Sequence, residues 1–172
     1  LSLIENHPTT GEPFSEEEHH QLARYIASQS FVLLKNDHLL PLTSTESILI
    51  VGDMAKNPRY QGSGSSLITP TKLPSLLDAL ENEQIPYTYT PGVGQKDLRD
   101  ETLLSEALSL AKQAKIVVIM AGLPETYESE GFDREHLHMP DSHIELISKI
   151  CEINKNVVVI LSAGSPGCIL SL

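Results

Sequence analysis

The stretch Ile48-Leu49-Ile50-Val51, which Gly52-Asp53 follows at once, decides the fold. Four consecutive aliphatic residues leave no polar face, so the run predicts a short strand that is buried on both sides. Two later runs have the same character, at 116–120 (IVVIM) and 157–161 (VVVIL). Strands of this kind are typical of parallel sheets, because the crossover helices that join them cover both faces.

Helical patterns separate these runs. Leucines and alanines at helical spacing predict helices over about 71–83 and 100–114, and Ile144, Ile147 and Ile150 mark a third. Residues 87–90 form a further strand pattern that ends at Pro91-Gly92. Alternating strands and helices with right-handed crossovers predict a doubly wound α/β fold: a mostly parallel sheet with helices on both faces, as in flavodoxin-like sandwiches.

The N-terminal segment differs from the rest. Residues 1–14 contain Pro8, Gly11 and Pro13 and show no periodicity, which predicts an arm or linker. Ser15, with Glu18 three residues later, is a capping-box pattern and predicts a helix that extends to about residue 29. The chain has 172 residues, a length that suits one core. We therefore expect a single α/β domain over 15–172.

Charge and composition exclude several classes of function. Twelve Lys and Arg face 23 Asp and Glu, a formal net charge of −11, which argues against nucleic acid and anionic membrane surfaces as partners. The apolar runs are far shorter than the roughly 20 residues of a membrane span. No leader pattern opens the sequence, and two cysteines form no disulfide framework, so a cytoplasmic setting is the expectation.

Neither a metal nor a cofactor is expected. His136, His138 and His143 are the only local group of histidines, and they lack a His-Glu-x-x-His pattern or paired cysteines. The Gly/Ser-rich segment 62–66 (GSGSS) lacks the Gly-Lys-Ser/Thr ending of a phosphate-binding loop and begins about ten residues after its strand. It is either a flexible turn or a loop whose glycines let the backbone approach a ligand, with Ser63 offering a hydroxyl.

Ligands of doubly wound sheets bind at the carboxyl ends of the strands. Three loops leave the predicted strands at that edge, over 53–70, 122–140 and 163–166, and the two long ones are also the polar ones. This coincidence marks the functional edge.

The second of these loops is strongly acidic. Seven acidic residues and one basic residue, Arg134, fall between Glu125 and Glu145. Carboxylates crowded beside one arginine can divide their roles, one ionised in a pair and one keeping its proton. Glycoside hydrolysis uses that division: a carboxylic acid protonates the leaving oxygen while a second carboxylate attacks or activates water. The alternative is a solvated acidic loop with an exposed contact between Asp133 and Arg134.

Four stretches in order resemble the C-terminal α/β domain of glycoside hydrolase family 3, the β-glucosidase and β-xylosidase family. They are 31–36 (FVLLKN) before 40–42 (LPL), 60–66 (YQGSGSS), 128–134 (ESEGFDR) with Leu137-x-Met139-Pro140, and 157–166 (VVVILSAGSP). Together they cover nearly the whole chain.

The resemblance implies a retaining mechanism, with an aspartate nucleophile on a preceding (β/α)8 barrel and a glutamate general acid/base in this domain. Glu130, which precedes Gly131, matches the acid/base position, and Glu128 is the alternative. A general acid that works near neutral pH needs a raised pKa, which burial or a like charge such as Glu128 would give.

The other site residues also follow from the resemblance. Ser63, between Gly62 and Gly64, matches a serine that reaches the sugar, whereas Asp133 and Arg134 are expected to fix the loop. The implied ligand is a β-linked glucoside or a related saccharide, and the implied partner is the barrel, to which residues 1–14 would lead.

The same resemblance implies that the chain is one part of a larger enzyme, truncated at its C-terminus. Without the barrel nucleophile we expect this chain alone to be inactive, and its uncovered apolar face makes self-association an expectation. The alternative from another class is a non-catalytic α/β module that binds a small ligand or a partner.

Overall fold

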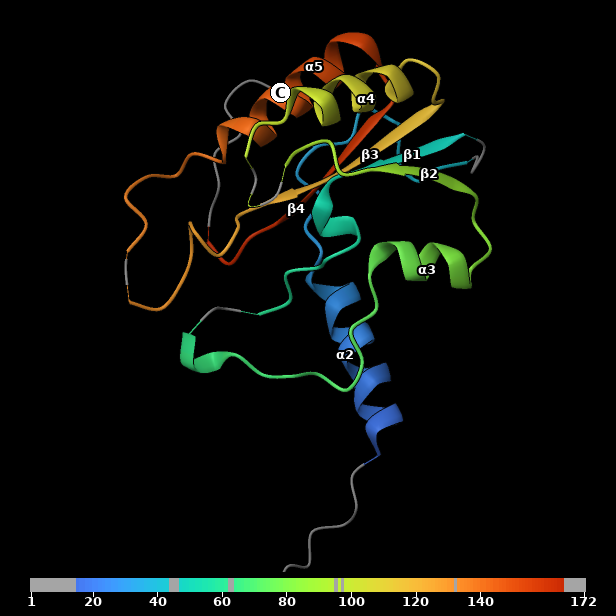
Figure 1. Cartoon of the computed structure of the whole chain (residues 1–172). Coiled ribbons are helices and arrows are strands. Elements are labelled where there is room, and N and C mark those ends of the chain that lie inside the picture. Colours follow the sequence, from blue (N-terminus) through green and yellow to red (C-terminus); the bar gives the residue numbers. More distant parts are fainter. Residues whose placement is uncertain are drawn as a thin grey trace, which may run out of the picture. The chain divides into compact units, whose positions relative to one another are not determined.

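The computed structural model describes residues 15–43, 47–61, 64–94, 96, 98–131 and 133–165 (Figure 1). These residues fall into two compact units, one ending at Asp37 and one beginning at His38. Each unit is described by itself below. The predicted domain bounds, a linker over 1–14 and one domain from residue 15, stay a prediction, and residues 1–14 lie outside the described part.

The first unit is built on helix α2, Glu16–Ser30. The Ser15 hydroxyl caps it by accepting a hydrogen bond from the Glu18 N–H at 3.2 Å, one of the two bonds of the predicted capping box. No residue of α2 is buried within the described chain. The apolar run 31–34 that follows is also exposed and lies outside any helix or strand.

The second unit contains one sheet of four parallel strands. They are β1 (Ile48–Val51), β2 (Tyr87–Thr90), β3 (Ile116–Gly122) and β4 (Val157–Ser162). Their order is β2-β1-β3-β4, and in the register Val51 lies between Thr90 and Ile119. All side chains of β1 are buried, whereas β4 at the sheet edge is mostly half-buried. The predicted parallel α/β fold is therefore confirmed.

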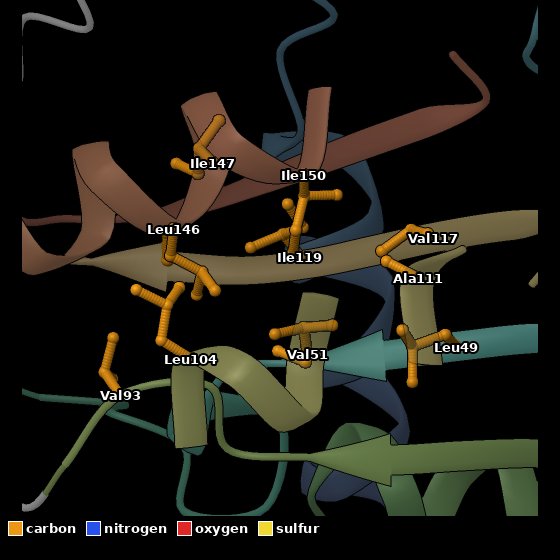
Figure 2. Packing of buried hydrophobic residues seen from close by; sticks show 12 residues of the cluster. Leu49, Val51, Val93, Leu104, Ala111, Val117, Ile119, Leu146, Ile147 and Ile150 are labelled. Carbon is orange, nitrogen blue, oxygen red and sulfur yellow. The ribbon is translucent and has the colours of Figure 1, made fainter. Parts of the chain in front are cut away.

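Helices α4 (Glu101–Ala111) and α5 (Asp141–Ile153) cover one face of the sheet (Figure 1). In this layer Ile119 of β3 and Leu104 of α4 lie near Ile150 and Leu146 of α5, and Leu49 of β1 lies near Ala111 of α4 (Figure 2). These side chains are almost completely withdrawn from solvent, with exposed fractions of 0 to 5%. This layer is the larger of the two hydrophobic cores.

Helix α3 (Leu76–Asn82) covers the other face, where Leu77 packs with Ile48 and Ile50 of β1. Because alternate residues of β1 serve the two cores, helices on both faces are confirmed. The expected helix over 71–83 is too long at its start. Ser75 and Asp78 form a capping box, with the Ser75 N–H donating to the Asp78 carboxylate at 2.8 Å, and this box begins the helix after Pro74.

Within the described ranges, none of the helices combines the length and the apolar character that crossing a bilayer requires.

Leu49 tests the larger core. Leu49→Ala should lower the free energy of unfolding by about 2–5 kcal/mol, because it removes a side chain that is 1% exposed and leaves a cavity between strand and helices. Urea unfolding measures this loss. The matched control is Leu98→Ala, at a leucine that is 67% exposed, where we expect a change within about 0.5 kcal/mol. Equal losses at the two positions would contradict the assigned core.

Candidate active site

Three loops meet at the carboxyl edge of the sheet. The loop after β1 contains the short 3₁₀ turns Asp53–Ala55 and Gly64–Ser66. The loop after β3 runs over 123–140, and residues 163–165 follow β4. Parallel strands release all their following loops at one edge, so segments more than 100 residues apart along the chain come together here.

The carboxylate of Glu128 joins all three loops. It accepts hydrogen bonds from the Gly164 N–H at 3.0 Å and from the Ser165 hydroxyl, both in the loop after β4. From the loop after β1, Nη1 of Arg59 donates to its Oε2 at 2.7 Å. The side chains of Arg59 and Glu128 are 16% and 13% exposed, so this ion pair is partly buried and largely shielded from solvent.

Arg59 also holds the backbone of the acidic loop. Its Nη1 donates to the Leu123 carbonyl at 2.5 Å, and its Nη2 donates to the Glu128 carbonyl at 3.0 Å. The guanidinium thereby ties the first residue after β3 to the residue where the acidic motif begins. We did not predict Arg59, because its partner is 69 positions away in sequence. The available signal was a single arginine placed directly before the Gly/Ser-rich segment.

These contacts set the charge of Glu128. Burial alone raises the pKa of its carboxyl, but the hydrogen bonds from Ser165, Gly164 and Arg59, with the Arg59 charge, outweigh burial and hold the pKa below its ordinary value. Glu128 is therefore the ionised, paired member of the acidic cluster. Its partner is Arg59 rather than its sequence neighbour Arg134, so the solvated-loop alternative is wrong for this residue.

Glu130 has different surroundings only two residues later. It is exposed, and its Oε2 accepts a hydrogen bond from the Ser65 N–H at 2.5 Å. Gly64 allows this approach: its φ is +85°, and a Cβ there would lie 2.4 Å from Oε2 and 2.5 Å from Cβ of Glu130. The structure therefore brings the expected acid/base candidate to the Gly/Ser-rich loop. Gly62 and Ser63 of that loop lie outside the described residues.

The expected rise in the pKa of Glu130 is not found in this chain. Hydrogen bonds from the Ser65 backbone and hydroxyl lower the pKa of its carboxyl, and desolvation opposes them only weakly. The expected rise depended on burial of Glu130 or on the like charge of Glu128. The side chain is exposed here, and Arg59 compensates the charge of Glu128.

The Gly/Ser-rich loop is closed at its base by Gln61. The amide of this side chain pairs with the backbone of Ile68, accepting from its N–H at 3.1 Å and donating to its carbonyl at 3.1 Å. The Tyr60 hydroxyl donates to the same carbonyl at 2.8 Å. These bonds fix the ends of a short excursion that presents the Ser65 N–H to Glu130.

Arg134 lies on the other side of the acidic loop. Its Nη1 donates to the Ser165 hydroxyl at 3.1 Å and its Nη2 to the His138 carbonyl at 2.9 Å. Ser165 therefore links Arg134 to Glu128. Asp133, the second residue expected to support the loop, is exposed.

A cleft of about 280 Å³ opens between the loops after β1, β2 and β3, with Asp53, Arg59, Gln61, Lys96 and Glu125 among the residues that line it. Neither Glu128 nor Glu130 lines this cleft, and Ser65 does not line it either. Glu130 stands instead on the open surface beside the Gly/Ser-rich loop.

The three neighbouring histidines do not converge. The rings of His136 and His138 lie 5.4 Å apart, and Tyr127 meets His136 edge-on at 6.0 Å. His143 is buried in α5, where its Nδ1 accepts a hydrogen bond from the Gly122 N–H at 3.4 Å. In the described part of the chain, no three His, Cys, Asp or Glu side chains are grouped as a metal site requires.

Glu128→Gln tests the partly buried ion pair. At pH 7 it should lower the free energy of unfolding by about 2 kcal/mol, because Arg59 keeps a shielded charge without its counterion. The folded pKa of Glu128 lies below the ordinary 4.5, so this stabilisation is complete above about pH 4.5 and is lost as the pH falls through the lowered pKa. Urea unfolding at pH 7 and pH 3 measures both effects.

The control for this prediction is Glu145→Gln. Glu145 is also paired, with Arg99 and Lys149, but both partners are well exposed, so we expect a loss below about 1 kcal/mol. A difference between Glu128→Gln and the unmodified chain that does not shrink anywhere as the pH falls below about 4.5 would contradict the assigned ionised state.

Comparison with known proteins gives a consistent result. The model of the glycosyl hydrolase family 3 C-terminal domain matches residues 31–170. The thermostable beta-glucosidase B of Acetivibrio thermocellus is 42% identical over 158 residues, which are 89% of this chain and 21% of that protein. An exo-alpha-(1->6)-L-arabinopyranosidase of Bifidobacterium longum is 44% identical over 164 residues, 88% of this chain and 22% of that protein.

A solved structure agrees with the sequence matches. The crystal structure of the Bifidobacterium adolescentis GH3 beta-glucosidase superposes with a TM-score of 0.86 at 42% identity, over 92% of this chain and 23% of that one. The chain thus spans about a fifth of the length of these relatives. The order of elements, the acidic loop and the Gly/Ser-rich loop all fall within the matched region, and the chain belongs to glycosyl hydrolase family 3 as its C-terminal α/β domain.

Proposed function

We propose that this chain is the second domain of a retaining β-glycosidase and that Glu130 is its general acid/base. The nucleophile of this enzyme is an aspartate on a (β/α)8 barrel domain, and the reaction is hydrolysis of an O-glycosyl bond. One observation carries the proposal: Glu128 is held in a partly buried ion pair that joins three loops, whereas Glu130 is exposed beside the Gly/Ser-rich loop.

The contrast between the two glutamates favours Glu130. A general acid must hold a proton, release it and reach the substrate. Glu128 is surrounded by donors that favour its ionised form, and both of its carboxylate oxygens already accept hydrogen bonds within this domain. Glu130 is exposed among the described residues and accepts hydrogen bonds from Ser65, so a ligand from outside this chain can reach it.

A covering domain supplies what Glu130 lacks here. Tyr60, Leu67 and Ile68 beside the Gly/Ser-rich loop are 44%, 64% and 64% exposed, an apolar surface that suits contact with another domain. Closure by the barrel removes water from the carboxyl of Glu130 and so raises its pKa toward the working pH. The lowered pKa of the Glu130 carboxyl in this chain is then a property of the site without its covering domain.

The chemistry follows the two steps of a double displacement. In the first step Glu130 gives its proton to the glycosidic oxygen while the barrel aspartate attacks the anomeric carbon, so the C–O bond breaks and a covalent glycosyl-enzyme forms. In the second step the Glu130 carboxylate takes a proton from water, and the resulting hydroxide equivalent displaces the aspartate. Glu130 ends protonated, as it began.

The proposed substrate is a β-linked glucoside or a related saccharide. The matched proteins bear names for a beta-glucosidase, an arabinopyranosidase and, at 35% identity, an exo-1,4-beta-xylosidase of Aspergillus oryzae. All three proteins match most of this chain, as expected of a domain that delivers protons to several kinds of pyranoside. We place the choice of sugar mainly on the barrel, with Ser63 between Gly62 and Gly64 as the contact from this domain.

Glu130→Ala in the barrel-containing protein tests the assignment. It should slow hydrolysis of alkyl or disaccharide substrates by about 10²–10⁴-fold in kcat/KM, and activated aryl glycosides far less, because a good leaving group needs little protonation. Added azide should restore turnover of the aryl glycoside and yield a glycosyl azide, since an anionic nucleophile needs no general base. Equal losses for both substrate types, with no effect of azide, would give Glu130 another role.

The isolated chain gives a second test. It should hydrolyse neither aryl β-glucosides nor β-xylosides at a measurable rate, because one carboxylate cannot carry out a double displacement. Turnover by the pure chain that Glu130→Gln abolishes would overturn the assignment of the nucleophile to a barrel. Sedimentation of the same sample tests whether the exposed apolar surface leads to self-association.

A further inference from the structure

We propose that Arg59 and Glu128 form a clamp that positions the proton donor, so that both are positioning residues of the reaction. This inference rests on the proposed role of Glu130. It assigns a function to the most extensively bonded charged pair at the carboxyl edge among the described residues.

The clamp holds the backbone of the acidic loop at two positions. Arg59 binds the Leu123 carbonyl, at the end of β3, and the Glu128 carbonyl, five residues later. Both ends of this short segment are thus held by one planar group. Glu130 follows after a single residue, Ser129, so the backbone that carries the proton donor starts from a fixed point.

Without the clamp, Glu130 is held only weakly. Among the described residues it accepts hydrogen bonds from Ser65, at an exposed site where hydrogen bonds compete with water. The contacts of Glu128, in contrast, are with Arg59, Gly164 and Ser165, come from two different loops, and are largely shielded from solvent. The position of the donor therefore depends on the clamp more than on its own bond.

The guanidinium and the carboxylate of the clamp depend on each other. Arg59 contacts three oxygens, two of them backbone carbonyls and one a carboxylate, which uses the spread of a guanidinium fork. A neutral group at either position leaves the other charge shielded and uncompensated. The loop then leaves the geometry in which the Ser65 N–H meets Glu130. A shift of about 1 Å at a reacting group can cost about 100-fold in rate.

The experiment compares Glu128→Gln, Arg59→Met and the double variant in the barrel-containing protein, with Glu145→Gln as matched control. Each is assayed on a disaccharide and on an activated aryl glycoside. We expect the single variants at Glu128 and Arg59 to lose about 100-fold in kcat on the disaccharide, far less on the aryl glycoside, and little in KM for either. The double variant should lose no more than either single variant, because the pair acts as one unit.

Loss of folded protein alone would lower both rates by the same factor, so the ratio of the two rates separates positioning from stability. An unchanged ratio in Glu128→Gln and Arg59→Met, or losses that add in the double variant, overturns the clamp. Recovery of Glu128→Ala by azide to the level of Glu130→Ala also overturns it, because Glu128 would then be the acid/base. If Glu130→Ala itself leaves the ratio unchanged, the proposed function has failed and the clamp falls with it.

A second readout is independent of turnover. Amide hydrogen exchange in the same proteins should become faster at Ser65 and Gly164 in Glu128→Gln, but only near Ser65 in Glu130→Gln, because Glu128 holds both loops and Glu130 holds one. Exchange at Ser65 that does not respond to Glu128→Gln would show that the two loops are not coupled and would overturn the clamp even if glycosidase activity is found.

Discussion

The site depends on one carboxylate, that of Glu128, which is largely shielded from water. Glu128 could not be buried alone, because an unpaired charge in a low-dielectric environment is strongly unfavourable. Arg59, Gly164 and Ser165 supply the counterion and the donors, and each comes from a segment remote in sequence from Glu128. The three loops must therefore come together for any one of them to be satisfied, which makes their arrangement cooperative.

The sheet makes that convergence possible. The continuous aliphatic runs at 48–51 and 116–120 predict strands buried on both faces, and helices at regular spacing between them leave only a parallel arrangement. For this reason the fold class and the functional edge could be read from the sequence. The start of α3 could not, since Pro74 at a first-turn position and the capping pair Ser75 and Asp78 gave competing signals for where the helix begins.

The candidate site was predictable to a lesser degree. Glu130 and the Gly/Ser-rich loop were found from their motifs, and the structure places Glu130 against Ser65. The distinct environments of Glu128 and Glu130 were not predictable, because they depend on Arg59, which lies 69 positions from Glu128 and has no local pattern. The state of the Glu130 carboxyl was predicted wrongly for this chain, since the invoked burial is missing and a backbone N–H favours the anion.

The position of β4 has a separate consequence. Among the described residues this strand pairs with β3 along one side only, and its side chains are mostly half-buried. Its other side carries a row of backbone donors and acceptors in an aliphatic sequence, a template on which a further strand can grow. An engineered version of this domain that is to stay soluble at high concentration needs a residue that blocks pairing at the free edge of β4. A lysine or a proline at an outward-facing position of this strand would do so.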